Sequence, residues 1–160
     1  MASAAHAGLT LDDLSIGTLV GGDSVMGNTA GSSDDMNGDA IMTGGSWNGG
    51  DDVYTLLWGG GDLVLDLLFA MPAPDGNDGD LDLFLFDNNL SGGPGELAQA
   101  LSLDANEQIE MLGLAAGTYY VSVDGWTGDT NAYTLNVSIP TPSSMALLGL
   151  GGLVVGRRRR

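Results

Sequence analysis

The stretch DDVYTLLWGGGDLVLDLLFAMP, residues 51–72, predicts the fold of this chain. In its second half Leu63, Leu65 and Leu67 recur at every other position, with acidic residues between some of them. Apolar and polar side chains that alternate with a period of two are typical of a β-strand with one buried face. The first half alternates in the same way, and three glycines, 59–61, separate the halves. The stretch therefore predicts two β-strands joined as a hairpin.

The same pattern recurs on both sides of this stretch. We expect further strands near residues 14–22, 24–29, 81–86, 109–111, 119–123 and 133–139. Roughly seven or eight short strands separated by turn residues are typical of an antiparallel β-sandwich. The only helix-like segment is GELAQALSL, residues 95–103, and the Gly-rich stretch 21–50 is expected to hold one edge strand within an irregular crossover.

Charge and composition exclude several classes of function. The chain has 21 acidic residues, and its four basic residues are the last four of the chain: Arg157, Arg158, Arg159 and Arg160. Nucleic-acid binding depends on Lys and Arg contacts to phosphate, so the acidic remainder excludes it. Cysteine is absent, which excludes disulfides and thiolate metal sites. His6 is the only histidine, so the residues for a serine triad or a zinc site are missing, and we predict that the protein is not an enzyme.

Four aspartates, Asp75, Asp78, Asp80 and Asp82, form the one candidate cation site. Asp80 and Asp82 are two residues apart, so they project from the same face of one strand. Oxygen ligands of this kind are the ones that Ca²⁺ takes, although the spacing does not fit an EF-hand loop. The simpler interpretation, which we favour, is a solvated face beside an Asx-rich turn. Ca²⁺ is therefore the candidate ligand of these aspartates, and no other cofactor is expected.

Four motifs follow one another along the strands, at Asp51–Tyr54, Asp80–Leu85, Ala116–Val123 and Tyr133–Val137. In type and order they resemble the motifs of the bacterial pre-peptidase C-terminal domain. The resemblance covers about residues 20–139 of the chain. It implies a jelly-roll-like β-sandwich, similar in fold to collagen-binding modules. Such domains are non-catalytic parts of secreted enzymes or surface proteins, which agrees with the missing catalytic residues.

The last 21 residues have a different character. Pro140, Thr141 and Pro142 end strand pairing, because proline cannot donate a ladder hydrogen bond. An apolar run without a polar side chain follows over residues 145–156, and the four arginines come next. Residues 140–156 as a helix would be about 25 Å long, which is marginal for a bilayer. We expect a short apolar helix whose arginines stay on the cytoplasmic side of the membrane.

This order of features resembles the PEP-CTERM sorting signal of Gram-negative bacteria, with Thr141 at the position where that family most often has Glu. The resemblance implies export, transient membrane anchoring and cleavage near Pro142 by an exosortase-type enzyme. It also implies association with exopolysaccharide or biofilm matrix. The residues that carry the predicted signal are Pro140, Thr141, Pro142, Arg157, Arg158, Arg159 and Arg160.

The N-terminus shows a weaker sign of export. Residues 5–7, Ala-His-Ala, have the small-x-small form of a signal-peptidase site. Residues 1–8 are therefore expected to be a signal-peptide remnant or a disordered N-terminus.

The sequence thus predicts an all-β module over residues 9–139 and a sorting and anchor segment over residues 140–160. The expected function is that of an exported, non-catalytic protein of the cell surface or extracellular matrix. The alternative is a lectin-like module that binds Ca²⁺ or a glycan and stays anchored in the membrane.

Overall fold

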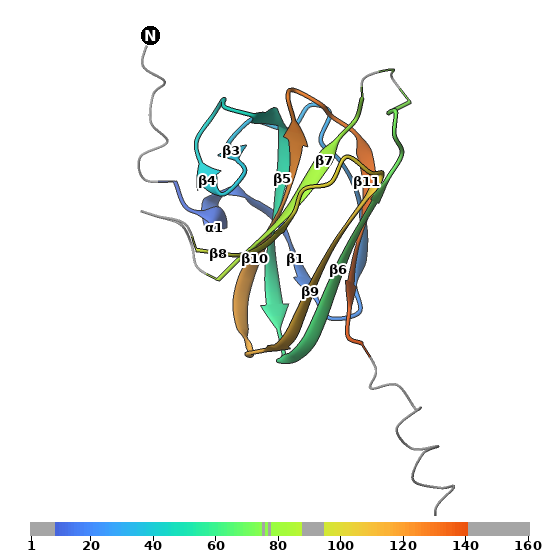
Figure 1. Ribbon diagram of the computed structural model, residues 1–160. Helices are drawn as coiled ribbons and strands as arrows, with labels where there is room; N and C mark the ends of the chain where they lie inside the picture. Colours follow the sequence, from blue (N-terminus) through green and yellow to red (C-terminus); the bar gives the residue numbers. More distant parts are fainter. Residues whose placement is uncertain (1–8, 75, 77, 88–94, 141–160) are drawn as a thin grey trace, which may run out of the picture.

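Two β-sheets face each other across one apolar core (Figure 1). The computed structural model describes residues 9–74, 76, 78–87 and 95–140. Sheet A has the strand order β1-β5-β10-β7-β8, and sheet B has the order β2-β11-β6-β9. The elements are α1 Leu11–Leu14, β1 Ser15–Val20, β2 Ser24–Asn28, β3 Met36–Asn37, β4 Ala40–Ile41, β5 Trp47–Trp58, β6 Gly61–Phe69, β7 Leu81–Phe86, β8 Glu96–Ala100, β9 Asn106–Leu114, β10 Gly117–Trp126 and β11 Ala132–Ser138. The predicted β-sandwich is therefore confirmed, whereas the helix expected after it lies outside the described residues.

The core between the sheets consists of the side chains that the period-two pattern assigned to it. In β6 and β7 the leucines at alternate positions are fully buried: Leu63, Leu65, Leu67, Leu81, Leu83 and Leu85. In β10 the residues Val121 and Val123 belong to the same core from the neighbouring strand. Complete burial of such a side chain contributes roughly 1.5–3 kcal/mol each, so these positions supply much of the driving force for folding.

The predicted hairpin within residues 51–72 is wrong, although both of its strands exist. β5 belongs to sheet A and pairs with β1 and β10, while β6 belongs to sheet B and pairs with β11 and β9. The glycines between them carry the chain from one sheet to the other, and Gly60 and Gly61 do so with positive φ angles of 93° and 107°. Periodicity defines the faces of a strand, but it does not select the partner strand.

Two further expectations are corrected by the strand pairing. β1 runs parallel to β5, so sheet A is mixed rather than antiparallel. The helix-like stretch 95–103 contains the edge strand β8, which pairs with β7 at Leu83 and Ala100. Helix propensity is a weak preference that tertiary pairing overrides, and here the edge of β7 supplies the alternative partner.

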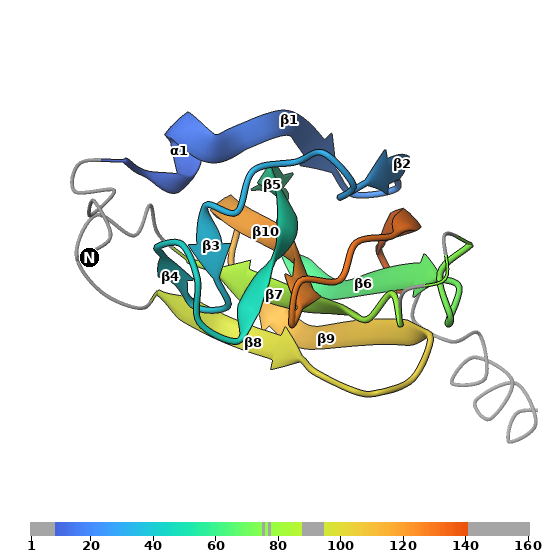
Figure 2. The ribbon, with the colours of Figure 1, turned by 90° about the horizontal axis from the view of Figure 1, so that it is seen from above.

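A second apolar layer covers the outer face of sheet A. The turn of helix α1 and the small β3–β4 hairpin lie beside this sheet (Figures 1 and 2). They bury a cluster of six side chains, Leu11, Met36, Val53, Phe84, Phe86 and Tyr120. Every residue of β7 is consequently buried. The Gly-rich stretch 21–50 thus contains the predicted edge strand, β2, and also the hairpin of this covering layer.

The residues that start this layer are capped locally. Thr10 precedes α1, and its hydroxyl oxygen accepts from the amide of Asp13 at 3.3 Å. The Asp13 carboxylate accepts in return from the amide of Thr10 at 2.9 Å, which completes a capping box. This places Leu11 with no exposed surface against the outer face of sheet A.

Candidate binding cavity

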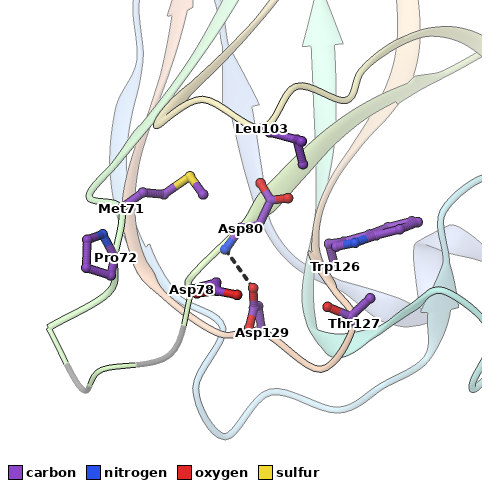
Figure 3. A pocket seen from close by; sticks show the side chains of 8 residues that line it. All are labelled: Met71, Pro72, Asp78, Asp80, Leu103, Trp126, Thr127 and Asp129. Carbon is purple, nitrogen blue, oxygen red and sulfur yellow. Dashed lines mark hydrogen bonds between the residues drawn. The ribbon is translucent and has the colours of Figure 1, made fainter.

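An open cavity of about 580 Å³ lies at the end of the sandwich where β6 and β10 finish and β7 and β11 begin (Figure 3). Three loops line it, with Met71, Pro72, Asp78 and Asp80 from the β6–β7 loop, Leu103 from the β8–β9 loop, and Trp126, Thr127 and Asp129 from the end of β10 and the β10–β11 loop. Three of these eight side chains are carboxylates and none is basic. The cavity is therefore a negatively charged concave surface with one aromatic side chain.

Hydrogen bonds that involve backbone atoms join the two acidic loops. The amide of Asp80 donates to Oδ2 of Asp129 at 3.0 Å, as the dashed line in Figure 3 marks. The amide of Trp126 donates to the carbonyl oxygen of Asp80 at 3.1 Å. Asn131 adds two bonds from Nδ2, to the carbonyl oxygens of Ala70 at 2.6 Å and of Gly79 at 2.9 Å. These hydrogen bonds connect the loops that line the cavity to one another.

The β10–β11 turn reaches the cavity through an irregularity in β10. The register with β5 shifts between Asp124 and Trp126, and such a bulge re-aims the side chain that follows it. Thr127 has a φ angle of 49°, which is unusual for a β-branched residue. Its amide donates to the carbonyl oxygen of Ser46 at 2.7 Å, and the amide of Asp129 closes the turn on Trp126 at 2.9 Å. These bonds hold the indole of Trp126 at the cavity wall.

Close backbone packing at Gly49 and Gly125 makes this turn possible. A Cβ atom added to either glycine would overlap the carbonyl oxygen of Asp129. Only glycine allows the start of β5, the end of β10 and the turn to approach so closely. Glycine is therefore needed at both positions to form the turn that lines the cavity.

Asp80 is the most constrained polar group in the lining. Only 4% of its surface is exposed, and its Oδ1 atom is buried without a hydrogen-bond partner. Burial raises the pKa of Asp80, and the nearby carboxylates of Glu107, Asp129 and Asp78 raise this pKa further. Burying a carboxylate oxygen without a hydrogen-bond donor costs free energy. A positively charged or hydrogen-donating partner at this oxygen would therefore stabilise the buried carboxylate.

Two tryptophans connect the cavity wall to Asp82. The ring of Trp126 packs edge-on against Trp47, with ring centroids 4.8 Å apart. Nε1 of Trp47 donates to Oδ2 of Asp82 at 2.5 Å. Burial raises the pKa of Asp82 to about 7, and the carboxylates of Asp80 and Glu107 add to the shift. Asp82 is therefore a buried acceptor behind the cavity wall.

The structure brings together only part of the predicted cation site. Asp78 and Asp80 line the cavity, Asp82 lies behind it, and Asp75 is outside the described residues. The favoured interpretation of a solvated face is wrong for Asp80 and Asp82, which are 4% and 3% exposed. The covering layer over sheet A buries β7 on the side that the pattern left open. Among the residues that the structure describes, no three acidic or histidine side chains are arranged to hold a metal ion, so Ca²⁺ binding stays a prediction.

A row of buried aspartates on the outer face of sheet A was not anticipated. Asp124 pairs with Asp51 across β5 and with Asp82 across β7, and all three are at most 7% exposed. We call Asp51, Asp124 and Asp82 the buried aspartate row. The amide of Met36 donates to Oδ2 of Asp51 at 3.0 Å, and the amide of Gly38 donates to Oδ2 of Asp124 at 2.9 Å. Asp51 and Asp124 thus fasten the covering hairpin to the sheet.

Trp126 and Asp129 were also missed as cavity residues. They are more than 40 positions from Asp80 in the chain, and only the strand register brings the two loops together. No spacing pattern within either loop signals this contact. The clearest local hint is the glycine at position 125, which permits the bulge.

Comparison with one solved structure supports the fold. The pre-peptidase C-terminal domain of a collagenase from Bacillus anthracis superposes with a TM-score of 0.51 at 15% identity, over 78% of this chain and 96% of that one. PliG of Aeromonas hydrophila, a periplasmic inhibitor of g-type lysozyme, gives a TM-score of 0.42 at 16% identity, over 79% of this chain and 98% of that one. No family model and no curated protein sequence matches the chain. The chain therefore has a β-sandwich similar to that of a pre-peptidase C-terminal domain.

The predicted sorting residues fall almost entirely outside the described part of the chain. Pro140 is exposed just after β11. The other six lie outside the described residues: Thr141, Pro142, Arg157, Arg158, Arg159 and Arg160. Within the described ranges, no helix is long and apolar enough to cross a bilayer. The predicted anchor, sorting signal and N-terminal segment, including His6, therefore remain expectations from the sequence.

Proposed function

We propose that this chain is an exported, non-catalytic module of the bacterial cell surface or extracellular matrix, and that the cavity at the end of its sandwich is its ligand-binding site. The cavity lining supports this proposal most directly. Its described residues include no histidine, cysteine, lysine or arginine. Carboxylates remain, but the cavity wall also holds Trp126 and apolar side chains, an arrangement suited to binding.

The position of the cavity relative to the end of β11 supports display at a surface. Asn131, just before β11, bonds to the loops beside the cavity, and Pro140 follows the other end of that strand. β11 thus runs from the cavity end of the sandwich to the opposite end (Figure 1). A segment after Pro140 that is held in a membrane would leave the cavity facing away from that membrane.

We further propose that residues 140–160 act as a PEP-CTERM-like signal. In this proposal the apolar run anchors the precursor, the arginines keep its end in the cytoplasm, and an exosortase-type enzyme releases the module near Pro142. The released protein then associates with exopolysaccharide. The residues between Ile139 and Met145 are the natural place for cleavage, because two prolines exclude them from strand pairing.

Cell fractionation tests this proposal. The full chain and a variant with all four arginines, residues 157–160, replaced by serine would be expressed in a Gram-negative host that carries an exosortase. The natural chain is expected in the membrane as a precursor and outside the cell as a shorter product, whereas the variant is expected to lose membrane retention. Accumulation of the unshortened chain in the membrane would instead favour a stably anchored module, and retention in the cytoplasm would contradict export.

A further inference from the structure

The chemistry of the cavity indicates what kind of ligand it binds. Asp80 is almost fully buried, lines the cavity and has one carboxylate oxygen without a partner. Figure 3 shows its carboxylate between Met71 on one side and Trp126 on the other. A donor that reaches Asp80 from the cavity would relieve the cost of burying this oxygen unpaired.

The charges around the cavity favour a positively charged ligand. Asp78 and Asp129 stand beside Asp80 in the lining, and Glu107 lies near enough to act on Asp80 electrostatically. No lysine or arginine precedes Arg157, so the sandwich has no lysine or arginine as a counter-charge of its own. Anionic ligands are repelled, and a neutral ligand would leave the mutual repulsion of these carboxylates unchanged.

The remaining lining fits a ring that carries hydroxyl groups. Trp126 is only partly buried and offers part of an aromatic surface, against which the face of a sugar ring or a cationic group packs favourably. The hydroxyl of Thr127 and the carboxylate of Asp129 lie beside it and can accept hydrogen bonds from sugar hydroxyls. The cavity is open and large enough for more than an isolated ammonium group.

We propose that the cavity binds a polysaccharide of amino sugars whose amines are free and protonated, with an ammonium group on Asp80 and the sugar ring against Trp126. This inference rests on the proposed binding role of the cavity and names its ligand class. A polymer with a positive charge on each sugar also matches a lining that presents several carboxylates. The high negative charge of the module as a whole would speed its encounter with such a polymer.

Two oligosaccharides of equal length provide a matched test. One is a glucosamine oligosaccharide with free amines, and the other is its fully N-acetylated counterpart, which has the same rings without the charge. Titration of the full chain in neutral buffer, followed by calorimetry, is expected to show binding of the free amine form and at least about tenfold weaker binding of the acetylated form. Equal affinity for both forms would overturn the proposal.

Variants locate the site. Asp80→Asn keeps the size of the side chain but removes its charge, and it is expected to weaken binding of the glucosamine oligosaccharide by about tenfold or more. Asp78→Asn changes an exposed cavity residue and is expected to weaken binding without any effect on folding. Asp62→Asn, outside the cavity lining at the opposite end of β6, makes the same charge change as a control and should leave affinity unchanged. Equal losses in all three variants would mean non-specific charge attraction and would refute the site.

Competing ligands distinguish the alternatives. Ca²⁺ and a lysine-rich peptide would each be titrated at the ionic strength used for the oligosaccharide. Displacement of the oligosaccharide by millimolar Ca²⁺, but not by Mg²⁺, would assign the cavity to a metal ion, and tighter binding of the peptide would assign it to a protein partner. Either result would overturn the amino-sugar proposal while leaving export and processing to be judged by fractionation.

Discussion

Asp124 lies directly opposite Asp82 on adjacent strands of sheet A, and both side chains are buried. Asp51 lies on the other side of Asp124 in the same row. Burial raises the pKa of Asp124 to about 8, with further contributions from the carboxylates of Asp51, Asp34 and Asp82. It also raises the pKa of Asp51 to about 6. The carboxyl groups of the buried aspartate row therefore stay protonated at pH values where the same groups of the unfolded chain are ionised.

This proton binding predicts that the protein loses stability as pH rises. The aspartates of the folded row bind more protons than the same residues in the unfolded chain from about pH 4 upward. Their contribution to the stability of the folded state is therefore fully present below that pH. It is lost as the pH rises through the folded pKa values, up to about 8. Each group with such a shift changes the free energy of unfolding by about 1.4 kcal/mol per pH unit within its window. Urea unfolding between pH 5 and pH 8 should show a fall of several kcal/mol.

Asp124→Asn should flatten this dependence, because the amide cannot ionise but can still accept from the amide of Gly38. At pH 8 the variant should be more stable than the natural chain. A stability that is flat or increases from pH 5 to pH 8 would contradict the raised pKa values.

A second prediction concerns Asp52, which accepts hydrogen bonds from two hydroxyl groups. Its Oδ2 atom accepts from the hydroxyl of Tyr133 at 2.6 Å, and its Oδ1 atom accepts from the hydroxyl of Ser32 at 2.7 Å. The hydroxyl of Tyr54 lies 2.8 Å from that of Tyr133. Asp52→Ala would leave these groups without their acceptor, and it should reduce the free energy of unfolding by about 1–3 kcal/mol.

Asp52→Asn keeps one acceptor oxygen and should cost less than Asp52→Ala. Asp104→Ala, an exposed position, should change stability by less than about 0.5 kcal/mol. Chemical denaturation at one pH measures all three variants. If Asp52→Ala were as stable as the natural chain, the network would have no structural role.

The period-two pattern predicted the faces of the strands, because alternation is a property of each strand alone. Leu63 and Leu83 were assigned correctly to the core for this reason. The pattern could not predict that residues 59–61 join two different sheets, since that depends on which strands pair. It also could not predict the burial of Asp82, because the layer that covers it comes from residues 11–41, far away in the chain. The cavity needs contacts between Asp80 and Asp129, which no local spacing indicates.

A third prediction tests the glycine that shapes the cavity. Gly125→Ala would place Cβ against the carbonyl oxygen of Asp129, and this backbone atom cannot move without disturbing the turn. We expect a loss of about 1–3 kcal/mol in stability, together with weaker binding of the glucosamine oligosaccharide. Gly59→Ala is the matched control, because no atom lies within 4 Å of its added Cβ. Thermal unfolding and calorimetry of both variants would decide the matter, and equal behaviour of the two would show that the close approach is unimportant.

Intact-mass spectrometry of the protein recovered from its native bacterium tests the central claim most directly, namely that the chain is an exported module released from a membrane anchor. We predict that the extracellular product lacks the segment that contains the four arginines, residues 157–160, with its new C-terminus near Pro142. Such a product would contain neither lysine nor arginine and would resist trypsin. Recovery of the native protein with Arg160 still attached would contradict the claim.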